Sequence, residues 1–195
     1  GRRRLIASGI PVVETWDLSD SPIDMMVGFS HEAVGIAVAD ALFARGFRRP
    51  GIVTANDDRA LRRRAGFEQR FAELGLPHIP ACIVPALANG RAGFAVLRRQ
   101  HPEIDVVFCG SDVIAHGVIT EAQAGGLSIP RDIAVMGFGD LPFAAHTHPP
   151  LATVRIDGRS IGQQAARFIL GRMDKQEVGP LVRDVGFSIV QRGSL

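Results

Sequence analysis

The chain has 195 residues, of which 46% are hydrophobic and 22% are charged, and its formal net charge is only +2. A hydrophobic share of this size supports a buried core, whereas so balanced a charge does not favour a nucleic-acid-binding surface. No segment approaches the ~20 consecutive apolar residues that a membrane-spanning helix needs, so no membrane association is expected.

The two cysteines, Cys82 and Cys109, both lie in apolar segments predicted to be strands. Free cysteine commonly behaves as a small hydrophobic residue, so both are expected to be reduced and buried. This favours a reducing compartment and predicts a cytoplasmic location. The chain begins GRRRL with no initiator Met, and no signal-peptide pattern follows, so it is interpreted as a fragment of a longer protein.

Predicted strands and helices alternate from one end of the chain to the other. Residues 2–4 are expected to be disordered. The predicted strands are 10–15, 25–29, 51–55, 81–85, 106–110, 133–138, 152–156 and 185–190. The predicted helices are 31–45, 59–74, 91–100, 112–124 and 160–172. Strands rich in Val and Ile that alternate with helices predict an α/β fold with doubly wound parallel sheets.

Polar side chains follow several of these strands. In an open parallel sheet, ligands bind beyond the carboxyl ends of the strands. The residues expected along that rim are Ser30, Asn56, Asp57, Ser111, Asp112 and Asp140. Such a rim suits a small ligand with many hydroxyl groups.

Each of these residues also has a purely structural interpretation. Ser111 or Asp112 can cap the helix that starts there, and Asp140 can be a turn residue. The run Arg62–Arg64 is typical of a solvated helix face. Its three side chains point in different directions, however, so one of them can reach the rim and hold a carboxylate through paired hydrogen bonds.

Signatures of catalysis are absent from the sequence. There is no G-x-S-x-G elbow, no P-loop and no G-x-G-x-x-G motif. His146 and His148 have a spacing that suits a metal, but no third ligand stands nearby, and a triad built on Ser30 and His31 lacks supporting spacing. We therefore expect no enzymatic activity, no catalytic residue, no cofactor and no bound metal.

Four segments, 29–54, 62–67, 109–140 and 148–157, resemble the effector-binding core of the lactose/galactose repressor family of transcription regulators. Segments 11–17, 25–29 and 185–195 resemble the gluconate-repressor branch of that family. The resemblance implies a periplasmic-binding-protein-like type I fold with two lobes. It also implies a repressor that senses a small sugar or sugar acid, binds operator DNA and forms a homodimer.

The resemblance also implies which residues hold the effector. Arg63 matches the arginine that commonly grips the ligand, Ser111-Asp112 matches a polar pair, and Phe29 matches an aromatic at a lobe crossing. The family often has an acid at the position of Gly139, whereas here Asp140 follows it. With Asp57 from the rim, the predicted ligand-binding residues are Phe29, Asp57, Arg63, Ser111, Asp112 and Asp140. Ala88 and Ile156 also depart from the pattern of neutral-sugar binders, so an anionic sugar acid is favoured.

The implied lobes are an incomplete N-terminal lobe, residues 1–29 and 156–178, and a C-terminal lobe, residues 30–153 and 182–195. The effector is expected between them. The rest of the first lobe and the DNA-binding head are expected ahead of Gly1. Two rival interpretations remain, a solute-binding protein of a sugar transporter and an enzyme acting on a sugar acid.

Overall fold

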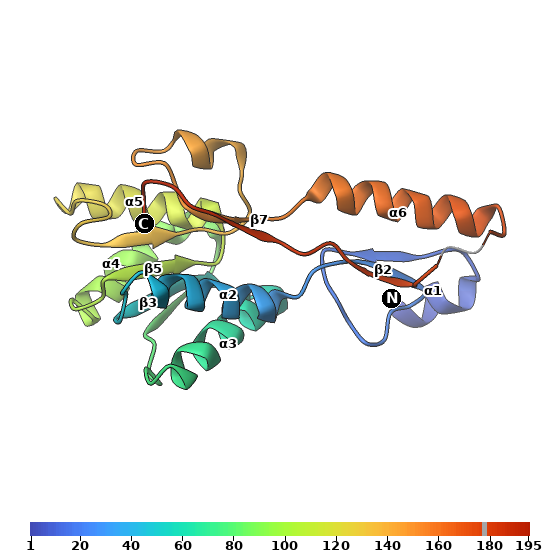
Figure 1. The fold of residues 1–195 in the computed structure, drawn as a ribbon, viewed down its shortest axis with the longest axis horizontal. Coiled ribbons are helices and arrows are strands. Elements are labelled where there is room, and N and C mark those ends of the chain that lie inside the picture. The colour runs from blue at the N-terminus through green and yellow to red at the C-terminus, as the bar shows by residue number, and fades with distance from the viewer. Residues whose placement is uncertain (177–178) are drawn as a thin grey trace. The chain divides into compact units, whose positions relative to one another are not determined.

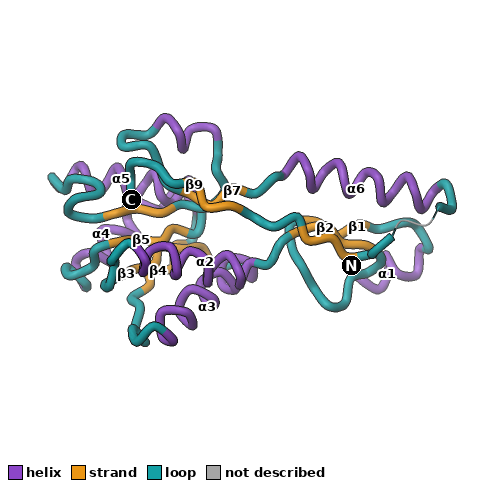
Figure 2. The backbone as a smooth tube through the Cα atoms, in the orientation of Figure 1, coloured by secondary structure: helices purple, strands orange, loops and turns teal. Residues whose placement is uncertain are grey.

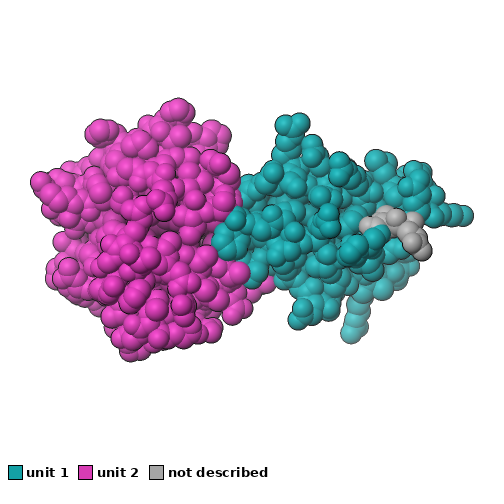
Figure 3. Space-filling model, in the orientation of Figure 1, with its two compact units in different colours: residues 1–31, 156–187 teal, residues 32–155, 188–195 magenta. Residues whose placement is uncertain are grey.

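The computed structural model describes residues 1–176 and 179–195 of the chain (Figure 1). Strands and helices alternate along most of that length (Figure 2). The chain divides into two compact units, which Figure 3 colours separately. Unit 1 comprises residues 1–31 and 156–187, apart from the two undescribed residues, and unit 2 comprises residues 32–155 and 188–195.

Unit 2 is built on a parallel four-stranded sheet in the order β4-β3-β5-β6. Its strands are β3 (Pro50–Ala55), β4 (Ala81–Val84), β5 (Val106–Cys109) and β6 (Ala134–Met136). Its helices are α2 (His31–Ala44), α3 (Asp58–Glu73), α4 (Gly90–Gln100) and α5 (Asp112–Ala124), with short 3-10 turns η1 (Leu87–Asn89) and η2 (Pro142–His146). The predicted doubly wound α/β fold is confirmed.

Helices cover both faces of this sheet. On one face, strand residues such as Val53 and Val107 pack in a single core with Phe94 of α4 and Ile114 of α5. On the other face, Phe108 of β5 stacks on a ring of α3, and Figure 1 shows α2 and α3 on that side. All four residues of β5 are buried, which explains why the strand has no polar alternation.

A two-stranded antiparallel ribbon continues unit 2 beyond β6. It pairs β7 (Thr153–Arg155) with β9 (Ser188–Val190). The residues after β9 return along the sheet, where Ser194 is fully buried. The Ser194 hydroxyl donates to the carbonyl of Val135 (2.6 Å) and accepts from the amide of Ala152 (2.8 Å).

Unit 1 contains a parallel three-stranded sheet in the order β1-β2-β8. Its elements are α1 (Arg2–Ser8), β1 (Val13–Thr15), β2 (Met25–Gly28), α6 (Gly158–Met173) and β8 (Val182–Asp184). The central strand β2 is buried throughout, whereas α1 buries no residue and α6 buries only Ile161 and Phe168.

Three expectations differ from the structure. Residues 2–4, expected to be disordered, form the first turn of α1. The predicted strand 185–190 is shorter, because only 188–190 pairs with β7. The predicted second lobe included residues 182–187, but β8 hydrogen-bonds to β2 and these residues belong to unit 1. The predicted lobe limit at residue 178 lies outside the described residues.

Within the described residues, no helix combines the length and the apolar character needed to cross a bilayer.

Candidate functional site: a polar rim on unit 2

The carboxyl ends of β3, β5 and β6 lie at one edge of the unit 2 sheet because these strands are parallel. Asp57 follows β3, Ser111 and Asp112 follow β5, and Asp140 follows β6. From here on, the rim means this edge together with Arg63; Ser30, which was expected along it, belongs to unit 1. Five of the six predicted ligand-binding residues therefore belong to unit 2, and Phe29 belongs to unit 1.

Arg63 is buried, with only 6% of the residue exposed, although it comes from a run of three arginines. Its guanidinium carbon lies 3.9 Å from the centre of the Phe138 ring, and its Nη2 donates to the carbonyl of Gly110 (3.0 Å). Arg62 is exposed, and Arg64 forms an ion pair with Glu68 (2.6 Å). Arg63 is thus the member of the run that reaches the ends of β5 and β6.

A close approach of two helices fixes the position of Arg63. A Cβ atom on Gly35 of α2 would lie 2.0 Å from the carbonyl oxygen of Arg63. A Cβ atom on Gly66 of α3 would lie 2.3 Å from the carbonyl oxygen of Glu32. Glycine at both positions lets α2 and α3 touch backbone to backbone, which holds α3, and Arg63 with it, against the sheet.

Ser111 and Asp57 are helix caps. The Ser111 hydroxyl accepts from the amide of Ile114 (3.2 Å) at the start of α5, and Oδ1 of Asp57 accepts from the amide of Ala60 (3.0 Å) at the start of α3. Each cap satisfies a backbone amide that has no partner within its helix. The capping interpretation is therefore confirmed for Ser111, and Asp112 is the first residue of the helix instead.

Asp112 is fully buried and joins three segments of unit 2. Its Oδ1 accepts from the hydroxyl of Thr153 on β7 (2.6 Å), and its Oδ2 accepts from the amide of Leu141 (2.7 Å). Burial raises the pKa of the Asp112 carboxyl, and these two hydrogen bonds offset part of that effect. A Cβ atom at residue 137 would lie 2.3 Å from Oδ1 of Asp112, so this contact requires Gly137.

Asp140 has a left-handed backbone, with φ of 52°, and both of its carboxylate oxygens contact arginines of unit 2. Oδ2 accepts from Nε of Arg155 (2.5 Å), and Oδ1 accepts from Nη2 of Arg192 (2.7 Å). Burial acts to raise the pKa of Asp140, but the hydrogen bonds from the two arginines outweigh it and lower the pKa below its ordinary value.

Sequence reasoning missed three residues of this network, namely Thr153, Arg155 and Arg192. All three lie in segments 148–157 and 185–195, which resembled the family but held no predicted ligand-binding residue. A usable signal existed in the final segment, where Arg192 is a charged side chain between the apolar strand β9 and the buried Ser194.

Phe29 lies at the end of the unit 1 sheet, with 1% of the residue exposed. Its ring meets His31 edge-on (4.6 Å between centroids) and also contacts Trp16 edge-on (6.4 Å). Nε2 of His31 lies 3.0 Å from the carbonyl oxygen of Trp16. In unit 1, Phe29 and His31 thus hold the turn that carries Trp16.

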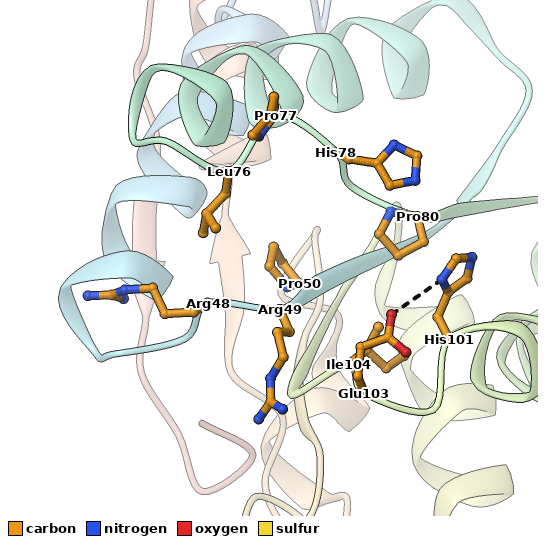
Figure 4. A pocket seen from close by; sticks show the side chains of 10 residues that line it. All are labelled: Arg48, Arg49, Pro50, Leu76, Pro77, His78, Pro80, His101, Glu103 and Ile104. Atoms are coloured by element: carbon orange, nitrogen blue, oxygen red, sulfur yellow. Dashed lines mark ion pairs between the residues drawn. The ribbon is translucent and has the colours of Figure 1, made fainter.

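Two described hollows of unit 2 contain none of the predicted ligand-binding residues. One is a cavity of about 280 Å³ near the amino ends of β3 and β4, at the opposite edge of the sheet from the rim. Figure 4 shows the side chains that line it. Beside it, Nδ1 of His101 lies 3.4 Å from Glu103. A second hollow, of about 390 Å³, is lined by residues of α5, of η2 and of the position after η2, namely Val113, His116, Phe143, His146 and Thr147. In the described part of the chain, no group of three or more His, Cys, Asp or Glu residues is placed to hold a metal ion.

Comparison with known proteins shows to which family this architecture belongs. The family described as "periplasmic binding protein-like domain" matches residues 39–195. The HTH-type transcriptional regulator GntR of Pseudomonas aeruginosa is 36% identical over 204 aligned residues, which cover 99% of this chain and 58% of that protein. GntR of Escherichia coli K12 is 32% identical, over 96% of this chain and 58% of that protein.

A solved structure agrees with these matches. The transcription regulator GntR from Chromobacterium violaceum superposes with a TM-score of 0.91 at 31% identity, covering 98% of this chain and 72% of that one. The chain therefore spans a little under two thirds of the two curated relatives named. It belongs to the lactose/galactose repressor (LacI) family, in the branch of the gluconate repressors, and it corresponds to the effector-binding core of that family.

Proposed function

We propose that this chain is the ligand-sensing part of a transcriptional repressor and that its effector is a small sugar acid of the gluconate type. The observation that carries the proposal is Arg63, a buried guanidinium held against Phe138 at the ends of β5 and β6. A guanidinium can bind a carboxylate through two parallel hydrogen bonds. GntR-type transcriptional regulators at 32–36% identity support the regulatory part of the proposal.

In this proposal the rim residues have different roles. Arg63 binds the carboxylate of the effector, and Ser111 and Asp57 bind its hydroxyl groups. Asp112, with both oxygens already used, holds the loop and strand around the ligand. Because a buried polar group left without its partner costs about 1–3 kcal/mol, the rim would select among ligands rather than simply attract them. That Phe29 of unit 1 also contacts the effector stays a prediction.

The rest of the mechanism concerns the whole protein. Effector binding would change the affinity of a DNA-binding head for operator DNA, and coupling of about 1–3 kcal/mol would be enough for regulation. We propose a cytoplasmic homodimer, since a two-fold operator is read by two heads. The α5–η2 hollow supports pairing of two copies, because none of its lining side chains carries a fixed charge and Phe143 is 37% exposed.

Calorimetric titration of the chain tests the ligand assignment. D-gluconate should bind more tightly than D-glucose, which has no carboxylate. Arg63→Gln should weaken gluconate by more than about 1.5 kcal/mol through loss of a charge-assisted pair, and Arg63→Lys should restore only part of it.

The matched control is Arg62→Gln, which changes the exposed neighbour and should leave affinity unaltered. Circular dichroism of each variant checks that the fold is retained. Equal binding of glucose and gluconate, or unchanged gluconate binding by a folded Arg63→Gln variant, would refute the sugar-acid proposal.

A further inference from the structure

Asp140 is the meeting point of two of the three chain segments that connect unit 2 with unit 1. The chain leaves unit 2 after Arg155, at the end of β7, and returns at Ser188, at the start of β9. Asp140 binds Arg155 directly, and it binds Arg192 just beyond β9. One carboxylate therefore contacts both the outgoing and the incoming segment.

The ion pair between Asp140 and Arg192 is largely shielded from solvent, which strengthens it. The side chains of Asp140 and Arg192 are 11% and 15% exposed, whereas that of Arg155 is 54% exposed. Arg192 also donates to the carbonyl of Leu151 (2.8 Å), on the segment that leads into β7. Hydrogen bonds to charged groups in such shielded positions are stronger than those between neutral groups.

The same network reaches the rim. The amide of Asp140 lies 3.4 Å from the hydroxyl of Thr153, and that hydroxyl donates to Asp112. The amide of Gly139 donates to the carbonyl of Val154 (2.9 Å). Displacement of β7 would therefore displace the partner of Asp112, next to Ser111.

We propose that Asp140 is a positioning residue: its negative charge holds β7 and the segment after β9 in place, and through Thr153 and Asp112 it shapes the rim. This assigns to Asp140 a role distinct from direct contact with the effector. The proposal rests on the proposed function only in taking the rim as the ligand site. The negative charge of Asp140 is the essential property, because two arginines face its one carboxylate.

Hydrogen exchange of the whole chain, followed by mass spectrometry, tests the positioning role without any ligand. Asp140→Asn retains the shape of the side chain and tolerates the left-handed backbone. It should speed exchange in peptides covering β7 and β9 by about tenfold, with β3 and β5 unchanged. Asp132→Asn, which alters an exposed pair with Arg131, is the matched control and should change none of these peptides.

A second substitution separates charge from packing. In Asp140→Asn the two arginines face each other without their counter-charge, so adding Arg192→Met should slow the exchange of β7 again. Arg155→Gln, at the more exposed partner, should speed β7 by a smaller factor and gives a reading if Asp140→Asn does not fold. Unchanged exchange in both single variants, or faster exchange in the double variant than in Asp140→Asn, would overturn the positioning role.

Gluconate titration of the same variants completes the experiment. Asp140→Asn should weaken gluconate several-fold while the preference for gluconate over glucose persists, because Arg63 is intact. Absence of gluconate binding by the unaltered chain would count against the proposed function alone, since the exchange result stands without ligand. Loss of the gluconate preference in Asp140→Asn would instead make Asp140 a direct contact and contradict the proposal.

Discussion

The two units use a similar alternation of strands and helices but differ in how completely they bury their apolar side chains. In unit 2 the sheet is covered on both faces, and Phe67, Phe71 and Phe108 are almost entirely enclosed. In unit 1 the strand β2 is equally buried, yet the helices around it expose large apolar side chains, including Ile6 (58%), Leu170 (59%) and Met173 (66%). Alternation alone therefore does not guarantee a closed core; enough neighbouring elements must also cover each face.

The difference extends to polar groups. Unit 2 buries Asp112 and nearly buries Asp140, and it satisfies both with partners from separate segments. A comparable ion pair of unit 1, between Asp24 and Arg172 (2.6 Å), lies near the surface, with side chains 24% and 39% exposed. Buried polar networks fix geometry because an unsatisfied member is costly. The rim therefore lies on the unit whose packing can hold side chains in place.

The largest expected effect comes from the aromatic core of unit 2. Phe67 lies between Phe71 (4.9 Å between centroids) and Phe108 (5.1 Å), so Phe67→Ala should lower the free energy of unfolding by about 3–5 kcal/mol. Leu170→Ala on α6 of unit 1 should change it by no more than about 0.5 kcal/mol. Urea unfolding followed by circular dichroism measures both, and fluorescence of Trp16, the single tryptophan, reports on unit 1.

A loss of 2 kcal/mol or more in Leu170→Ala, on the scale of a buried leucine, would contradict the comparison. It would mean that the apolar surface of α6 is covered in solution.

Two glycines in helices should respond with opposite signs. Gly35→Ala would bring a Cβ atom within 2.0 Å of the backbone oxygen of Arg63, so the free energy of unfolding should fall by about 1–3 kcal/mol. Gly162→Ala in α6 meets no atom within 4 Å and should stabilise the chain by about 0.5–1 kcal/mol through helix propensity. Thermal unfolding of the two variants gives the comparison, and stabilisation by Gly35→Ala would show that α2 and α3 are not in backbone contact.

The smallest effect concerns the pH dependence of the buried carboxyl. Burial raises the pKa of Asp112, so between the ordinary Asp value of about 3.9 and the folded value the folded state binds more protons than the unfolded state. The contribution of Asp112 to the free energy of unfolding therefore falls as pH rises through that interval, by about 1.4 kcal/mol per unit of pKa difference.

Asp112→Asn removes this titration, and its amide can still accept from Leu141 and donate to Thr153. Unfolding free energies measured from pH 4 to 7 should show the wild-type chain losing stability relative to Asp112→Asn as pH rises. A relative gain with rising pH would contradict the assignment of burial as the leading cause. The control in unit 1 is Asp24→Asn, whose exposed pair with Arg172 should contribute no more than about 1 kcal/mol.

Several elements followed directly from the sequence, because their cues are local. Helix α5 begins and ends as predicted, with Ser111 as its cap and Gly125 after its last residue. The buried parallel strands were visible as apolar runs. By contrast, β8 was missed, because Val182–Asp184 is a short exposed strand whose only definition is its pairing with β2. Residues 2–4 were wrongly expected to be disordered, because a charged terminus gives no local sign of a helix.

For the rim, the local sequence was enough to predict which residue types follow the strands, since strand ends and helix caps depend on neighbours along the chain. Which arginine of Arg62–Arg64 is buried could be carried over only from a family resemblance, and tertiary structure supplied the reason in the glycine contact between α2 and α3. The partners of Asp112 and Asp140 were decided by tertiary structure alone. Thr153 and Arg192 lie 41 and 52 residues away along the chain, and no local pattern links positions so distant.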